Sequence, residues 1–575
     1  MTQFRATLLR HTALPGMLAA VLAVGLLLAP AQARAQSSDT TAMIKLIQLL
    51  IDKGVLTPDQ ASALVKQAQA EAHAAKPAKA KPAATTAGEP VPPPAAEPPP
   101  VPPGTQRVTY VPQIVRDQIA GEVRAQVMQQ AQNEGWAAPN QAPEWTKRIR
   151  FYGDVRVRAE ELWQNKSNAP LPDFNAINSS TTGYDDSTGA LPPSLNTNEN
   201  RTRGRLRARL GMEARIDDWV TSDIRIATGN DNSPVSTNQT LGSGGDFSKY
   251  ALWLDRAYLT LTPYQSLKMY VGRTPNPFWT TDLMYNDDLS FDGISAMTTY
   301  PLNGMLDVFV NAGAFSLYNT ELGFSTFNTP KFPSHNKYLF AAQAGVNYKP
   351  RPDVLNTFAL GFFDYASIDG KGSQPCTIIQ ANIGCNTDAS RAQALQTGNT
   401  LFAIRNINFT GSSSANPQYY GLASRFDILD LRERLQYTGF KVPVALDMEF
   451  SKNLGYSRSY VVNRNPVNNI GNNNAYQGGD TGYMFKLVVG KTDVVEKWDW
   501  NLYAGYKYIE SDAVLDGLTD SAFHGGGTNA KGYMLGGSVG IAHNLWLVGR
   551  YFATTQVSGP SEANQLLQID LNARF

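Results

Sequence analysis

Net charge, cysteine and long apolar runs are all scarce in this sequence. Its 575 residues carry 50 lysines and arginines against 49 aspartates and glutamates, a formal net charge of +1. A chain so nearly neutral lacks the overall cationic field that attracts nucleic acid. Beyond the N-terminal stretch, no window approaches the roughly 18 uninterrupted apolar residues of a transmembrane helix. The remaining classes are a soluble exported protein and a membrane β-barrel.

Cysteine and histidine, which supply many reactive sites, are also few. Cys376 and Cys385 are the two cysteines, and both lie in a polar segment. In an exported protein such a pair predicts one loop disulfide, with two free thiols as the alternative. The histidines are scattered without metal-ligand spacing. The GGSVG motif around Ser538 lies inside an alternating segment rather than a strand–turn–helix. We therefore expect no enzyme, catalytic residue, metal or cofactor.

The N-terminal segment, residues 1–35, has the pattern of a secretory signal peptide. Two arginines precede an apolar stretch from Leu14 to Leu28, and small residues follow up to Ala35. This predicts cleavage near Ala35. The alternative is a membrane-anchoring helix, but the apolar stretch is shorter than the roughly 20 residues of a span and is interrupted by proline and glycine.

Three segments of different composition follow. Residues 36–72 predict two short helices broken at Gly54, and residues 73–106 form an Ala/Pro-rich linker without a core of its own. Residues 107–146 predict a helix whose Val115, Ile119 and Val123 are four positions apart. The apolar stripe of this helix fits either three-stranded self-association or packing under the next domain. Together these segments form a helical periplasmic extension.

Residues 147–575 change to a period of two, which continues to the last residue. In RIRFYGDVRVRAE, for example, Phe151, Val155 and Val157 alternate with charged residues. About 16 such segments occur, and most are longer than the roughly 5 or 6 residues usual for strands of a soluble sandwich. Their connections alternate between short and long. This pattern predicts an all-β fold, a transmembrane antiparallel β-barrel of about 16 strands with both ends on the short-turn side.

Arginines dominate one face of the first two strands. The stretch RTRGRLRARLGMEARI, which begins at Arg201, alternates arginines with Leu206, Ala208 and Leu210. An arginine facing lipid at the bilayer midplane costs about 2 to 4 kcal/mol, so these side chains must face a wet lumen. The predicted pore-lining arginines are Arg150, Arg156, Arg158, Arg203, Arg205, Arg207 and Arg209.

The C-terminal strand NQLLQIDLNARF keeps its alternation up to Phe575. It is similar to the signal by which the barrel-assembly machinery recognises outer-membrane proteins. Four motifs, in this order, resemble the bacterial family of outer-membrane barrels called Putative porin: IKLIQLLIDKGVLTPDQASALVKQA, RTRGRLRARLGMEA, VGRTPNPFWTTDLMYNDDLSFDGISA and GYMFKLVVGKTDVVEKWDWNLYAGYKYIESD. The resemblance implies a pore surrounded by outer-membrane lipid, with a homotrimer as the family-level expectation, and it assigns no solute.

The third long connection carries Asp282, Asp287 and Asp288. In general-diffusion porins, which this layout resembles, the third loop folds inward and sets an acidic edge against an arginine wall. The hypothesis is that these carboxylates face the first two strands and create a transverse field. The alternative is an ordinary exposed loop.

Two functions remain open on these observations. The first is a porin for passive diffusion of small hydrophilic solutes, with a preference for anions that comes from the arginines. The second is a structural or adhesive barrel with a plugged lumen, tethered to the cell envelope by its N-terminal segment. The helical head and linker motivate the second function, because a simple pore needs neither.

Overall fold

The computed structural model describes residues 120–127, 129–130, 144–185, 191–231, 233–408 and 416–575. The predicted signal peptide, helical head and Ala/Pro-rich linker (1–35, 36–72 and 73–106) lie outside this range. Residues 120–127 and 129–130 are helical, within the region where a helix is predicted. None of the helices described is long and apolar enough to span a membrane.

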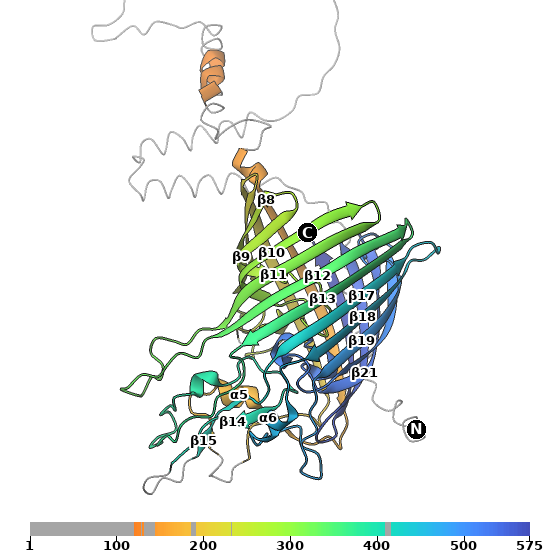
Figure 1. Ribbon diagram of the computed structural model, residues 1–575. Coiled ribbons are helices and arrows are strands. Elements are labelled where there is room, and N and C mark those ends of the chain that lie inside the picture. Colours follow the sequence, from red (N-terminus) through yellow and green to blue (C-terminus); the bar gives the residue numbers. More distant parts are fainter. Residues whose placement is uncertain (1–119, 128, 131–143, 186–190, 232, 409–415) are drawn as a thin grey trace, which may run out of the picture. The chain divides into compact units, whose positions relative to one another are not determined.

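Sixteen antiparallel strands close into a barrel, as the period of two predicts (Figure 1). Each wall strand pairs with the next one around the ring, and the last strand pairs with the first. The wall strands are β1 (Ile149–Gln164), β5 (Arg201–Asp217), β6 (Val220–Ala227), β8 (Trp253–Tyr264), β9 (Leu267–Pro275), β10 (Ser290–Asn303), β11 (Leu306–Tyr318), β12 (Lys337–Arg351), β13 (Val354–Ala366), β17 (Asp427–Tyr437), β18 (Val444–Asn453), β19 (Thr481–Gly490), β20 (Trp500–Ile509), β21 (Ala530–Ala542), β22 (Leu545–Gln556) and β23 (Ala563–Arg574).

The two faces of the wall follow the alternation of the sequence. On β1, Phe151 and Val157 are 66% and 43% exposed on the outer face, whereas Arg158 and Glu160 are buried inside. Because side chains alternate along a strand, a slip of one residue would turn the arginines toward lipid. The apolar face therefore fixes which side of each strand forms the lumen.

The barrel closes where β1 meets β23. Gly153 and Phe575 exchange two backbone hydrogen bonds, N to O at 3.1 and 3.0 Å. The Phe575 ring lies so close that a Cβ on Gly153 would stand 2.6 Å from its Cζ atom. Glycine at this position thus allows the C-terminal residue to seat against the first strand.

Short turns join the strands at one end of the barrel, and long loops join them at the other (Figure 1). The C-terminus lies at the short-turn end. The loops contain β2 (Leu171–Pro172), β3 (Tyr184–Asp185), β4 (Ser194–Leu195), β7 (Gln239–Thr240), β14 (Leu401–Ala403), β15 (Pro417–Gln418), β16 (Tyr420–Leu422), α5 (Phe174–Ser179), α6 (Arg458–Val462) and the 3₁₀ turns η3 (Asp388–Ser390), η4 (Asp516–Leu518) and η5 (Phe523–Gly525). A further 3₁₀ turn, η1 (Glu144–Arg148), precedes β1.

The segment from Leu401 belongs to a loop. Its strand β14 pairs with β16 in a separate two-stranded sheet and does not join the wall. In the same loop, Cys376 and Cys385 are joined by a disulfide, with their Cα atoms 5.8 Å apart.

An aromatic cluster fills part of the barrel interior. Phe278, from the loop between β9 and β10, makes edge contacts with Phe315 of β11 and Phe363 of β13 at centroid distances of 6.1 and 5.1 Å. Phe363 is fully buried and Phe315 is 2% exposed. The loop 276–289, called the inward loop below, is therefore packed against inward-facing side chains of the wall.

Candidate functional site

Paired strands β1 and β5 bring arginines directly opposite one another. In their antiparallel register, Arg156 faces Arg207 and Arg158 faces Arg205. Like charges directly opposite on one face of a sheet are destabilising. The wall can hold this arrangement only if carboxylates or water neutralise it.

One compensating carboxylate comes from the last strand. Asp570 of β23 receives two hydrogen bonds from Arg158, from Nε to Oδ1 at 2.6 Å and from Nη2 to Oδ2 at 2.8 Å. The side chains of Arg158 and Asp570 are 5% and 1% exposed. This two-pronged pair lies across the closure of the barrel and is shielded from solvent.

Two further carboxylates come from β1 itself. Glu160 accepts a hydrogen bond from Arg203 and lies 3.8 Å from Arg205 Nη1. Asp154 is bonded by Arg207 and Arg209, whose Nε atoms lie 2.9 and 2.6 Å from its two oxygens. These carboxylates neutralise their neighbours across the strand pair.

The inward loop supplies the fourth carboxylate. Asp288 Oδ1 lies 3.2 Å from Arg207 Nη1 and 3.1 Å from Arg209 Nη1, while Thr237 donates to Oδ2 at 3.0 Å. Burial alone would raise the pKa of Asp288, but Arg207, Arg209 and Arg156 outweigh it and hold this pKa at about 2. The loop is thus bound to the arginine wall by an ionised carboxylate.

The other two loop aspartates lie elsewhere. Although burial opposes it, Lys486, Lys507 and Arg550 of β19, β20 and β22 together lower the pKa of Asp282. The Asp282 backbone carbonyl accepts a hydrogen bond from Lys507 Nζ at 3.3 Å. Asp287 has an exposed side chain. Of the three predicted loop carboxylates, the structure brings Asp288 alone into ion-pair contact with the described arginines of the first two wall strands.

The inward loop is also held on the far side of the barrel. The Thr281 backbone N–H donates to Glu449 Oε1 of β18 at 3.0 Å, and the Trp279 N–H donates to Gln343 Oε1 of β12 at 2.8 Å. The Arg432 guanidinium stacks over the Trp279 ring at 4.1 Å from its centroid. The loop therefore crosses the lumen between two anchored ends and narrows it.

The remaining predicted arginines differ in exposure. Arg150 is 71% exposed near the short-turn end and lies 3.5 Å from Glu213. Arg156 is buried and donates to Asn238, but its Nε atom has no hydrogen-bond partner among the described residues. On the face formed by β1 and β5, the arginines therefore outnumber the carboxylates that pair with them. The arginines are Arg156, Arg158, Arg203, Arg205, Arg207 and Arg209, and the carboxylates are Asp154, Glu160, Asp288 and Asp570.

Sequence reasoning placed Glu160 on the polar face of its strand without assigning it to this site, and it missed Asp154 and Asp570 altogether. Asp154 lies two positions before Arg156 and therefore on the same face of β1. Asp570 lies on the polar face of the last strand between Gln568 and Asn572, a face that the apolar alternation of that strand already implies. Reading both faces of each strand would have found the two carboxylates. Their pairing with particular arginines needs the register.

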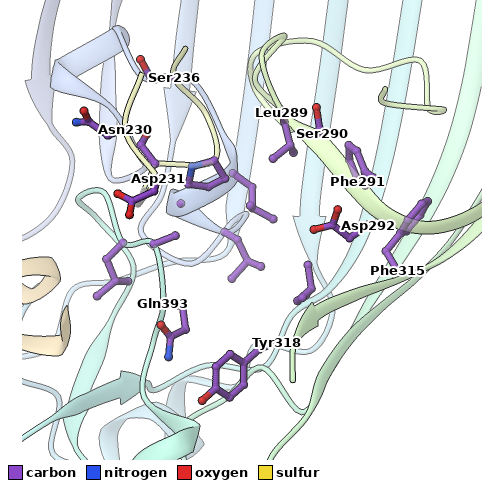
Figure 2. A pocket seen from close by; sticks show the side chains of 18 of the residues that line it. Asn230, Asp231, Ser236, Leu289, Ser290, Phe291, Asp292, Phe315, Tyr318 and Gln393 are labelled. Carbon is purple, nitrogen blue, oxygen red and sulfur yellow. The ribbon is translucent and has the colours of Figure 1, made fainter. Parts of the chain in front are cut away.

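A cavity of about 660 Å³ adjoins this cluster on the loop side (Figure 2). Thr237, which binds Asp288, and Leu289 line it. Figure 2 shows Phe291 and Phe315 from the wall on one side and Asp231 and Gln393 from two loops on the other. The cavity thus forms a partly apolar vestibule before the arginine wall.

Three known structures are similar to this chain at low identity. Pseudomonas putida OprB at high pH is 11% identical with a TM-score of 0.39, covering 75% of this chain and 95% of that chain. The outer-membrane channel DcaP of Acinetobacter baumannii is 12% identical with a TM-score of 0.35, covering 74% and 97%. A triple mutant of the Rhodopseudomonas blastica porin is 9% identical with a TM-score of 0.32, covering 74% and 100%.

No curated protein matches this chain. The family described as Putative porin matches residues 40–575, which is nearly the whole sequence. Family and fold together point to an outer-membrane channel rather than an enzyme. The chain belongs to the Putative porin family.

Proposed function

We propose that this barrel allows passive diffusion of small hydrophilic solutes across the outer membrane and prefers anions. The observation that carries the proposal is the excess of arginines over their ion-pair carboxylates on the β1–β5 face, which the inward loop contacts through Asp288. Arg156, buried and without a carboxylate partner among the described residues, is the clearest source of that excess. A narrow passage with one sign of charge raises the local concentration of the opposite ion.

Charge replacement in the arginine wall tests the selectivity. Two unit charges about 7 Å apart in water interact with an energy of about 0.6 kcal/mol, and salt screens part of this energy. Replacing Arg203, Arg205 and Arg207 together by serine should therefore shift the anion-to-cation permeability ratio several-fold toward cations. The measurement is the reversal potential of single channels in a planar bilayer under a salt gradient.

The matched control replaces the same three arginines by lysine, which keeps the charge. It should retain the anion preference of the natural protein. Folded protein without any conductance would refute the channel, whereas a natural protein that prefers cations would refute the selectivity alone.

Assembly partners extend the proposal. The last strand, ending in Phe575, would be recognised by the barrel-assembly machinery, and the mature protein would form a homotrimer in outer-membrane lipid. The exposed ring of Phe575, which is 65% accessible, supports the first point. The trimer is an expectation from the family resemblance.

A second function, a structural barrel tethered to the envelope, is favoured by one observation. The inward loop takes part in a large aromatic cluster inside the lumen, with Tyr285 and Phe291 rings 5.1 Å apart. Deletion of residues 36–104 separates the two functions. A channel should conduct as before, whereas a tether should lose its attachment to the cell wall, measured by sedimentation with isolated wall.

A further inference from the structure

A second cavity, of about 290 Å³, lies among the long loops and is called the crown cavity here. Segments from several connections line it, within residues 170–174, 396–401, 467–470, 516–529 and 556–562. It shares Asn399 and Asp516 with the vestibule, so these residues stand between the two spaces. Solutes approaching the barrel from the loop side would meet the crown cavity near the vestibule.

Two hydrogen-bond acceptors in the crown cavity are not satisfied by the loops, and the carboxyl group of Glu562 lies beside one of them. His524 Nε2 and Gln556 Oε1 are buried without a hydrogen-bond partner among the described residues. Glu562 Oε2 lies 3.8 Å from His524 Nε2, with the two side chains 9% and 4% exposed. Buried polar atoms without partners are uncommon in folded proteins and call for a ligand or water.

The tautomer of His524 follows from its other nitrogen. Nδ1 lies 2.9 Å from Thr554 Oγ1, and that hydroxyl donates its proton to Asn564 Oδ1 at 2.7 Å. Nδ1 must therefore carry the imidazole proton, which leaves Nε2 as an acceptor. The crown cavity thus offers two free acceptors and the Glu562 carboxyl group, from the two segments 516–529 and 556–562.

The other amides around the crown cavity are already engaged. Asn529 Nδ2 donates to Asn469 Oδ1 at 3.0 Å and to the Ser558 carbonyl at 2.8 Å. Asn399 Nδ2 donates to two loop carbonyls, those of Ser511 and Val514, at 2.6 and 2.8 Å. The hydrogen bonds of these amides are satisfied within the loops, whereas His524 Nε2 and Gln556 Oε1 have no partner among the described residues.

The opposite lining of the crown cavity is apolar, with Leu171, Phe174, Leu401 and Pro560. The volume is about ten times the roughly 30 Å³ share of one water in the liquid, and it lies near the lower limit of small-molecule sites. An oxygen at the usual distance of about 2.8 Å from both Nε2 and the Glu562 carboxyl would bridge their gap. A ring with hydroxyls at its edge and C–H groups on its face fits both linings.

Burial also keeps the site nearly uncharged. It lowers the pKa of His524 to about 4 and raises the pKa of Glu562 to about 7. Between these values the imidazole is neutral and the carboxyl is largely protonated, so it can donate as well as accept. A neutral ligand therefore matches the site better than an ion.

We propose that the crown cavity binds a neutral polyhydroxylated solute of about monosaccharide size, through His524, Gln556 and Glu562. Hydroxyl groups of the solute donate to His524 Nε2 and Gln556 Oε1, and its apolar face lies against Leu171 and Phe174. The site stands apart from the arginine wall and does not depend on anion selectivity.

Glucose binding to the folded full chain tests this. Isothermal titration at pH 6, in a zwitterionic detergent without a sugar headgroup, should give saturable binding near the millimolar range. Gln556→Leu and Glu562→Leu should each weaken it at least tenfold. A matched pair, His543 and Glu496, lies exposed at a turn with Nδ1 and Oε1 2.8 Å apart. His543→Phe and Glu496→Gln should leave binding unchanged.

Leu171→Trp provides a second variant, which fills the crown cavity from its apolar side and leaves the polar network intact. It should abolish glucose binding while the protein keeps the gel mobility of a folded barrel. No saturable glucose binding up to 100 mM (about a hundredfold above the expected range) would overturn the proposal. Binding unaffected by the cavity variants, or binding of methylammonium or Zn²⁺ in place of glucose, would overturn it as well.

Discussion

Replacing Asp570 by alanine is expected to destabilise the barrel by about 3 to 5 kcal/mol, because buried Arg158 then loses its two hydrogen bonds to a carboxylate and keeps only Glu160 at 4.0 Å. Arg158 gives both of its hydrogen bonds in this pair to Asp570, and both side chains are almost completely buried. Arg550 also lies 3.9 Å from the same carboxylate. The loss should appear as a lower urea midpoint for unfolding from lipid vesicles, followed by tryptophan fluorescence.

A double variant and an exposed pair provide the controls. Arg158→Ala combined with Asp570→Ala should recover part of the loss, because the buried guanidinium of Arg158 is then absent. Glu199→Ala removes an exposed pair with Lys166, whose side chains are 58% and 64% exposed. That change should cost less than about 1 kcal/mol. An Asp570→Ala protein as stable as the natural one would show that solvation by water compensates the charge of Arg158 without Asp570.

The barrel itself was predictable because lipid leaves few alternatives. Residues such as Leu206, Ala208 and Leu210 have to face the hydrocarbon, and the arginines between them then have to face inward. The strand count near 16 and the alternation of short and long connections are confirmed by the structure. Within the regular parts of the wall strands, the period of two decides the face of each residue from sequence alone.

Contacts between distant segments could not be predicted from the sequence in the same way. Arg158 and Asp570 are 412 positions apart, and only the register of β1 on β23 places them together. Within the inward loop, the sequence gives Asp282, Asp287 and Asp288 equal standing. The packing of Phe278 and the bonds of Thr281 to Glu449 set the path of the loop, and that path brings Asp288 alone to the described arginines of β1 and β5.

Asp288→Asn is expected to release one edge of the inward loop from the wall. Arg207 and Arg209 would lose a shared carboxylate and keep Asp154 of β1 as their ion-pair partner. Conductance should rise because the loop no longer narrows the lumen so firmly, and the reversal potential should move further toward anions because one negative charge is gone. Single-channel recording of the variant against the natural protein measures both changes.

Asp287→Asn is the matched control, since it removes the same charge from the neighbouring, exposed position of the same loop. It should alter the reversal potential slightly and leave the conductance unchanged. If both variants behave alike, the ion pair of Asp288 does not restrain the loop. A rise with Asp288→Asn alone would assign the restraint to its contacts with Arg207, Arg209 and Thr237.

The pH dependence of the same contact follows from the direction of the shift. The pKa of Asp288 falls from its ordinary 3.8 to about 2 in the folded protein. Its ion pairs therefore stabilise the fold above pH 4, by about 2 kcal/mol, and this contribution is lost as the pH falls from about 4 toward 2. Acid titration of the unfolding midpoint should show this loss in the natural protein and its absence in Asp288→Asn. A loss of equal size in both proteins would assign the acid sensitivity to other carboxylates.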